Sequence, residues 1–170
     1  LACWTIVAAV LAGAAMGRAP AVAIYLVSFV YYGLYWQAFA WGTPSFDAFK
    51  RDALLLKALS VVALAFVYLQ APPDLPSLAV IALGILLNAR AAAVLGIDRT
   101  YYGHELAGFP ERRITAFPYS LMSHPMIVGN VMAFGGTLLN PAFRAAWWPL
   151  PTLHVVLNLG LLAMERAGPG

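Results

Sequence analysis

Residues 75–96 read LPSLAVIALGILLNARAAAVLG, and this stretch decides the fold. A helix needs about 20 predominantly apolar residues to cross the hydrocarbon core of a bilayer, and this run has that length. Asn88 and Arg90 interrupt the apolar pattern near its C-terminal end. Residues 97–123, which follow, form the longest polar connection in the chain. The stretch therefore predicts a membrane-spanning helix that ends beside a polar juxtamembrane loop.

The composition places the whole chain in the same class. Hydrophobic residues make up 62% of the 170 residues and charged residues only 10%, whereas a soluble domain carries roughly a quarter charged residues. The mean hydropathy is +0.79. The net charge of +3, without a long basic run, argues against nucleic acid as a partner, and the lone Cys3 excludes an internal disulfide. These values predict an all-α, polytopic protein integral to a lipid bilayer.

Proline- and glycine-containing breaks divide the chain into apolar segments of helical length. Besides residues 75–96, the predicted spans are residues 2–17, 21–42, 53–70, 125–139 and 147–165. A short interfacial turn is predicted around Ser45, ahead of the third span. We expect five to six transmembrane helices in a single membrane domain over residues 1–170. Its parts are N-terminal spans over 1–96, the polar loop over 97–123 and a C-terminal helical hairpin over 124–170.

The distribution of basic residues predicts the orientation, because cytoplasmic loops are enriched in Lys and Arg. With six alternating spans, Arg18 and Arg144 fall on one side. The other side carries six basic residues, namely Lys50, Arg51, Arg99, Arg112, Arg113 and Arg166. The polar loop is therefore expected on the cytoplasmic face.

Polar residues within the predicted spans are candidates for function, because they are costly in lipid. Arg90 lies roughly 9 Å from the end of its span by helical rise. It either extends to lipid phosphate or faces an internal cavity. His154 and Asn158 share a face of the last span, as Asn130 and Thr137 do on the preceding one. These stripes either line a pocket between the two helices or form interhelical hydrogen bonds.

His124 directly precedes Pro125 and is expected at the threshold of a helix, because the residue before a proline disfavours helical geometry. Metal binding is not expected, since three widely spaced histidines and one cysteine match no known ligand spacing. A Rossmann-type nucleotide site is excluded by the lack of a glycine-rich turn after a strand.

Residues 111–130, which read ERRITAFPYSLMSHPMIVGN, together with DRTYYG at residues 98–103, resemble the phospholipid methyltransferase family. Its closest members to this pattern are phosphatidylethanolamine N-methyltransferases, and isoprenylcysteine carboxyl methyltransferases are related. The resemblance covers residues 82–165. The combination of Arg-x-Thr-x-Phe-Pro with His-Pro-Met and Gly129 is far more specific than any one of its parts.

The resemblance implies a membrane-embedded methyltransferase that uses S-adenosylmethionine. The implied acceptor is the amine of phosphatidylethanolamine or of its methylated intermediates. By position in the family pattern, Gly84, His124 and Glu165 would bind the cofactor, and the C-terminal hairpin would complete its site. A cofactor with a carboxylate tail also needs basic or amide groups, which Arg113 and Asn130 would supply.

Catalytic roles follow from the same implied reaction. The substrate amine must lose a proton before it attacks, so His124 or Glu105 is a candidate base. Tyr102 would place an aromatic group near the cationic cofactor. Arg90 and Arg112 would hold the phosphate of a membrane phospholipid that enters sideways from the bilayer.

Two departures from the family pattern support an alternative. Ala82 replaces the first glycine of a Gly-x-Gly pair, and Met164 replaces one residue of an acidic pair. The alternative is a catalytically silent member that serves as a structural subunit of a larger membrane complex. A methyltransferase for a thiol or a prenylated cysteine is a third possibility, although Arg-x-Thr-x-Phe-Pro favours the phospholipid branch. The expected membrane is the endoplasmic reticulum, with a mitochondrial or thylakoid membrane as the alternative.

Overall fold

A computed structural model of the chain describes residues 20–43, 45–110 and 114–167, with side chains up to residue 163, and the isolated residues 8, 12, 13 and 17. The predicted first span, residues 2–17, therefore lies almost entirely outside the described residues. Within the described ranges the chain is helical and contains no strand, which confirms the all-α class. It divides into two compact units, Leu1–Tyr68 and Leu69–Gly170. The single membrane domain expected over residues 1–170 stays a prediction.

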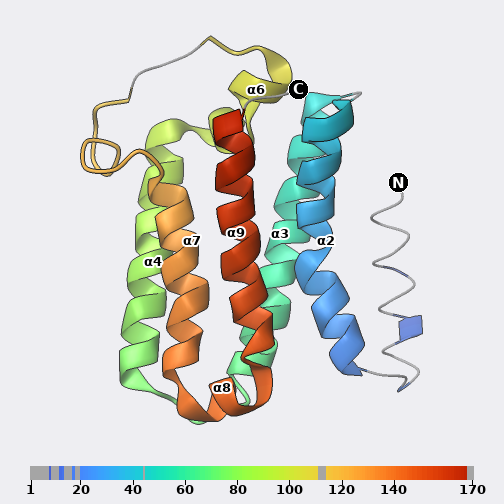
Figure 1. The fold of residues 1–170 in the computed structure, drawn as a ribbon, viewed down its shortest axis with the longest axis vertical. Helices are drawn as coiled ribbons and strands as arrows, with labels where there is room; N and C mark the ends of the chain where they lie inside the picture. The colour runs from blue at the N-terminus through green and yellow to red at the C-terminus, as the bar shows by residue number, and fades with distance from the viewer. Residues whose placement is uncertain are drawn as a thin grey trace. The chain divides into compact units, whose positions relative to one another are not determined.

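The first unit contains an antiparallel pair of helices, α2 (Pro20–Trp41) and α3 (Phe46–Tyr68) (Figure 1). The hydroxyl of Ser60 donates a hydrogen bond of 2.7 Å to the backbone oxygen of Ser28 on α2. The rings of Tyr35 and Phe49 meet edge to face at 5.7 Å. The buried residues of α3 recur every three or four positions along one face, as Phe49, Ala53, Leu56, Ser60, Leu64 and Val67. This spacing is the signature of a helix that packs along a single stripe.

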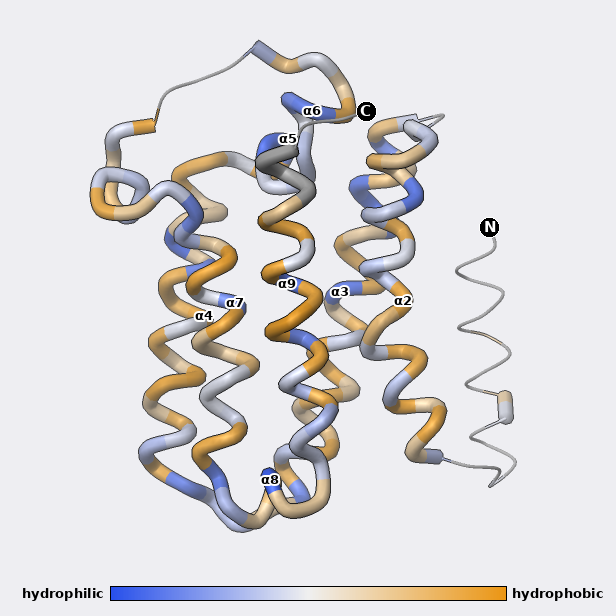
Figure 2. The backbone as a smooth tube through the Cα atoms, in the orientation of Figure 1, coloured by the Kyte–Doolittle hydropathy of each residue, from blue (hydrophilic) through white to orange (hydrophobic). Residues whose placement is uncertain are grey.

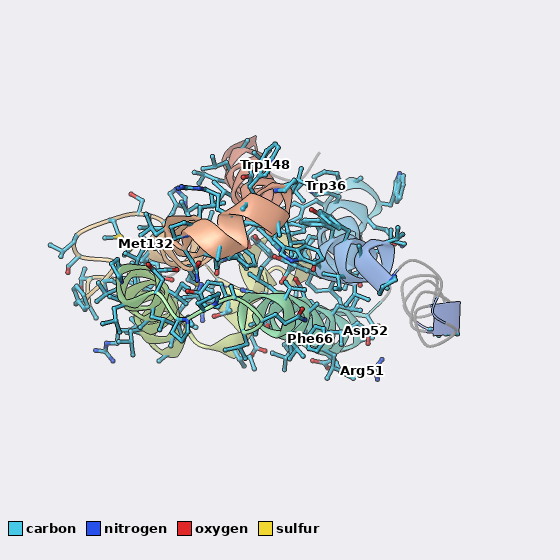
Figure 3. The ribbon with its side chains drawn as sticks, turned by 90° about the horizontal axis from the view of Figure 1, so that it is seen from below. Trp36, Arg51, Asp52, Phe66, Met132 and Trp148 are labelled. Atoms are coloured by element: carbon cyan, nitrogen blue, oxygen red, sulfur yellow. The ribbon has the colours of Figure 1, made fainter. Side chains whose placement is uncertain are left out.

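The predicted short turn around Ser45 is wrong as a separate element, because α3 already begins at Phe46. The Ser45 hydroxyl accepts a hydrogen bond from the Ala48 amide, as a helix N-cap does. The pair formed by Asp47 and Lys50, 3.1 Å apart, spans the first turn. Figure 3 looks along the helices and shows Arg51 beside Asp52, to which it is bonded at 2.9 Å. Local capping thus extends this helix seven residues upstream of the predicted start at residue 53.

The second unit is built on three long helices, α4 (Leu75–Leu95), α7 (Pro125–Gly136) and α9 (Pro149–Ala167). Helix α7 packs against both α4 and α9. The start of α4 is fixed by the Asp74 carboxylate, which accepts a hydrogen bond of 2.9 Å from the Ser77 amide. Gly96, with φ of 84°, ends the helix because this conformation favours glycine. The helix predicted for residues 75–96 is confirmed.

A sharp corner joins α7 to α9. The chain passes through a 3₁₀ turn, η1 (Thr137–Leu139), and bends by 100° into α8 (Pro141–Trp147). The predicted segment 125–139 is confirmed by α7 and η1 together, but α8 was not predicted. The Asn140 carboxamide starts α8 by accepting hydrogen bonds from the Ala142 and Phe143 amides. The same side chain donates a bond of 2.9 Å to the Pro72 carbonyl, which ties the corner to the turn ahead of α4.

Length and composition identify two described helices that could cross a membrane, α2 and α4. A third exists if α7, η1 and α8 are counted as one broken span, and α9 carries a shorter apolar stretch, Pro149–Ala163. Figure 2 shows the apolar segments along these helices and more hydrophilic residues in the connections between them. The chain is thus an integral membrane protein, whereas the count of five to six spans stays a prediction.

Candidate functional site

The contact between α4 and α7 is a direct approach of the two backbones at two glycines. A Cβ atom added to Gly84 would lie 2.5 Å from the Ala133 amide nitrogen and 2.6 Å from the Gly129 oxygen. A Cβ atom added to Gly129 would lie 2.7 Å from the Gly84 oxygen. All three distances are far below van der Waals contact, and each involves a backbone atom that cannot rotate away. The Cα of Gly84, expected to face a cofactor, is therefore covered by α7.

Three asparagines connect the three long helices in series. The Asn88 amide on α4 donates bonds of 2.9 Å to the Met126 carbonyl and 2.8 Å to the Asn130 side chain on α7. The Asn130 amide donates at 2.9 Å to the Asn158 side chain on α9. Asn158 in turn donates at 2.8 Å to the carbonyl of His154, one turn away on the same helix. We call Asn88, Asn130 and Asn158 the asparagine layer.

The bond between Asn130 and Asn158 confirms the hydrogen-bonding alternative for these two residues of the polar stripes on α7 and α9. Next to it, the His154 ring stacks on Phe134 with centroids 4.2 Å apart and an angle of 10°. Thr137, the other stripe residue, donates to the Phe134 carbonyl on its own chain segment. By helical rise the layer lies roughly 7 Å from the start of α7 and roughly 10 Å from the end of α4. It therefore lies within the helices, somewhat closer to the polar loop than to the corner near α8.

Replacing Asn130 with Ala should remove both links through the layer at once. An interhelical hydrogen bond in a membrane protein is worth about 0.6 kcal/mol on average, so the expected loss is about 1–2 kcal/mol. The measurement is the free energy of unfolding in mixed micelles titrated with dodecyl sulfate. The control is Thr152→Ala, because the Thr152 hydroxyl bonds only to the Trp148 carbonyl within its own turn. Equal losses in both variants would contradict a connecting role for Asn130.

Residues 97–110, which we call the knuckle, form a small folded element at the end of α4. It comprises α5 (Ile97–Thr100) and α6 (Gly103–Ala107). The Arg99 guanidinium donates a bond of 2.9 Å to the Pro110 carbonyl, and the His104 imidazole Nδ1 lies 2.7 Å from the Phe109 carbonyl. These contacts close the knuckle on itself. The predicted polar loop thus contains an ordered element in its first half.

The residues at the centre of the knuckle, Tyr101 to Gly103, are closely packed. Tyr102 adopts a left-handed conformation with φ of 63°, which non-glycine residues rarely adopt. A Cβ atom on Gly103 would lie 2.4 Å from the Phe109 ring and 2.7 Å from the Asp98 backbone oxygen, so a larger residue would force the backbone to shift. Tyr101 is buried, and this burial raises the pKa of its phenol. Strain at an aromatic residue that the neighbouring structure holds in place is typical of functional sites. The two predicted residues Tyr102 and Glu105 both belong to this element.

The remaining predicted site residues lie at a helix end, on an exposed helix face or outside the described residues. His124 is the N-cap residue of α7, confirming its position at the helix threshold, and Pro125 occupies the first turn. Arg90 is exposed on α4, so it does not face the interior of its own unit. Arg112 and Arg113 lie outside the described residues, as does the side chain of Glu165, whose backbone belongs to α9. No metal-binding cluster of His, Cys, Asp or Glu occurs among the residues that the structure describes.

The structure also identifies residues that the sequence did not single out as site members. Asn88 completes the asparagine layer, and His104 is held by Phe109. Asn88 could have been identified from the sequence, since this polar residue interrupts an apolar run. His104 could not have been identified in this way, because its partner Phe109 lies across a turn of the knuckle and no periodic sequence pattern relates the two residues.

Comparison with known families identifies the family of the chain. The model of the phospholipid methyltransferase family matches residues 75–167, which is more than half of the chain. The matched region begins at the first residue of α4 and ends at the last residue of α9. No curated protein and no solved structure matches the chain.

Proposed function

The chain belongs to the phospholipid methyltransferase family, and from this premise we propose that it methylates the amine of phosphatidylethanolamine or of its methylated intermediates, with S-adenosylmethionine as the methyl donor. The observation that carries the proposal is the family match over residues 75–167, which include the knuckle and the asparagine layer of the second unit. The Arg-Ile-Thr-Ala-Phe-Pro motif at residues 113–118 supports a phospholipid acceptor.

S-adenosylmethionine supplies an electrophilic methyl group on a sulfonium, and the protein must bind and orient it. The residues at the polar end of the second unit fit its polar groups. Asn130 is a half-buried amide that gives one of its two amide hydrogens to Asn158, whereas both amide hydrogens of Asn88 are given to Met126 and Asn130. Such fixed amides suit a carboxylate or ribose hydroxyl. We propose that Asn130, His124, Arg113 and Glu165 contact the cofactor. Gly84 would act by letting α7 approach rather than by touching it.

The lipid substrate would approach α4 from the bilayer. The outward face of this helix is apolar and exposed, with Leu83, Ile85 and Leu86 all more than half exposed. Arg90 lies on the same helix close to its C-terminal end and is exposed too. An arginine at that depth reaches the headgroup region, where its guanidinium can bind a phosphate. We propose that Arg90 and Arg112 hold the phosphate of the substrate, in the membrane of the endoplasmic reticulum or of a mitochondrion or thylakoid.

The test is methyl transfer by the purified chain in nanodiscs that contain phosphatidylethanolamine. His124→Ala and Glu165→Ala should each lower turnover at least tenfold, since positioning supplies most of the rate of such a displacement. Arg51→Gln is the control, because Arg51 is an exposed residue of the other unit that pairs with its neighbour Asp52. Unchanged turnover in both site variants would refute the assignment.

A silent structural subunit of a larger membrane complex is the second candidate, and two observations favour it. Gly84 is covered by α7, and Met164 stands where the family pattern has an acidic residue. Binding of radiolabelled S-adenosylmethionine to the folded chain separates the two functions. Binding supports the enzyme, whereas a folded chain without binding supports the structural role.

A further inference from the structure

His104 occupies a distinctive place among the three histidines of the chain. His154 is fully buried against Phe134, and His124 lies at the start of α7. His104 is exposed. It belongs to α6, which lies at the end of the second unit where α4 ends (Figure 1). Its Nδ1 lies 2.7 Å from the Phe109 carbonyl oxygen.

The Phe109 contact fixes the tautomer of His104. A carbonyl oxygen only accepts hydrogen bonds, so Nδ1 must carry the hydrogen. In the neutral imidazole, Nε2 then holds a lone pair, and the exposure of the ring leaves it accessible from the solvent side. A histidine oriented in this way is a typical general base, because the bond at one nitrogen determines what the other can do.

The surrounding knuckle keeps the ring in place. The Phe109 ring lies close against Gly103, and the Phe109 amide donates a bond of 3.0 Å to the Gly103 carbonyl. The Arg99–Pro110 bond closes the segment beyond Phe109. The residue whose carbonyl orients His104 is thus held by a backbone hydrogen bond at its own amide and by a side-chain hydrogen bond at the next residue.

We propose that His104 is the base that deprotonates the headgroup amine of the substrate, an inference that rests on the proposed function. The ammonium gives one proton to Nε2. The amine nitrogen then attacks the sulfonium methyl carbon, the new N–C bond forms, and the C–S bond breaks with its electron pair going to sulfur. The imidazolium returns its proton to water, to which the ring is exposed. An amine in a lipid headgroup lies at the membrane surface, and His104 lies beyond the C-terminal end of the apolar helix α4, in the polar connection that follows it.

The decisive comparison is between His104→Asn and His104→Ala in nanodiscs. An asparagine amide can still donate to the Phe109 carbonyl but has no basic nitrogen. Both variants should therefore lose about 100-fold in kcat, within the range usual for general bases, with unchanged binding of S-adenosylmethionine. Thr100→Val is the matched control, because it removes another hydrogen bond of the same knuckle and should keep the wild-type kcat. A wild-type kcat in His104→Asn would overturn the proposal and leave His104 with a structural role.

A second readout needs no turnover. Nitrogen-15 NMR of the histidine-labelled chain at alkaline pH, assigned by the signal lost in His104→Asn, should show protonated Nδ1 and unprotonated Nε2. The opposite tautomer would overturn the proposal. A wild-type chain that neither binds S-adenosylmethionine nor transfers methyl groups would instead refute the proposed function, and the catalytic role of His104 with it.

Discussion

Gly84→Ala and Gly129→Ala should each destabilise the second unit by about 1–3 kcal/mol, the usual cost of forcing an extra carbon into a packed contact. Each new methyl group would collide with backbone atoms of the opposite helix at 2.5–2.7 Å. Because backbone atoms cannot swing aside as a side chain can, α4 and α7 must separate along their contact. That separation would also stretch the bonds from Asn88 to Met126 and Asn130.

Thermal unfolding in detergent micelles is the measurement, and Gly135→Ala is the matched control. Gly135 lies on α7 six residues after Gly129, but its added Cβ would meet only a Val155 methyl group at 3.9 Å. Since alanine favours helix by about 1 kcal/mol over glycine, this control should be neutral or stabilising. In the double variant Gly84→Ala/Gly129→Ala the two losses should not add, because both act on one contact. Full additivity, or equal effects of all three single substitutions, would contradict the close approach.

How much of the fold the sequence predicts depends on whether the signal is local. The apolar run and the proline in the first turn predict the helix over residues 75–95, and its bounds are predicted to within one residue. Helix α8 was missed, because Asn140-Pro141 reads as a break, and only the structure shows the Asn140 side chain starting a new helix there. A proline after a capping residue both ends one helix and begins another.

The site is less predictable than the fold, since it depends on pairings between distant segments. Polar residues on α7 and α9 indicate that those helices make hydrogen bonds, but not that Asn130 joins Asn88 to Asn158. Gly84 shows the same limit. Its position in a family pattern indicates a cofactor site, whereas its surroundings show a helix contact, and periodicity does not distinguish the two. No sequence pattern marks His104 as a site residue, because its orientation depends on the contact with Phe109, which only the structure shows.

The corner between η1 and α8 should respond strongly to changes at Asn140, which is 1% exposed and acts on both sides of the turn. Asn140→Ala removes the cap of α8, at about 0.5–2 kcal/mol. It also removes the bond to the carbonyl of Pro72, an exposed residue, which costs about 0.5–1.5 kcal/mol because water can replace the lost donor. The expected total is about 1–3 kcal/mol, measured by the same unfolding titration in mixed micelles.

Two further variants separate the two roles of Asn140. The Asn140→Ser variant keeps a hydroxyl that can cap α8, but this side chain is too short to reach Pro72. It should therefore keep the stability that the cap contributes and lose only the stability from the bond to the Pro72 carbonyl, which we call the tether. Asp74→Ala removes a cap from α4 without any tether, and its loss should match the difference between Asn140→Ser and Asn140→Ala. If Asn140→Ser unfolds as readily as Asn140→Ala, the tether to Pro72 carries the whole effect and α8 needs no cap. If Asn140→Ser is as stable as the wild type, the tether contributes nothing, and the 100° bend is maintained by the cap and by the packing of Phe143, which is buried.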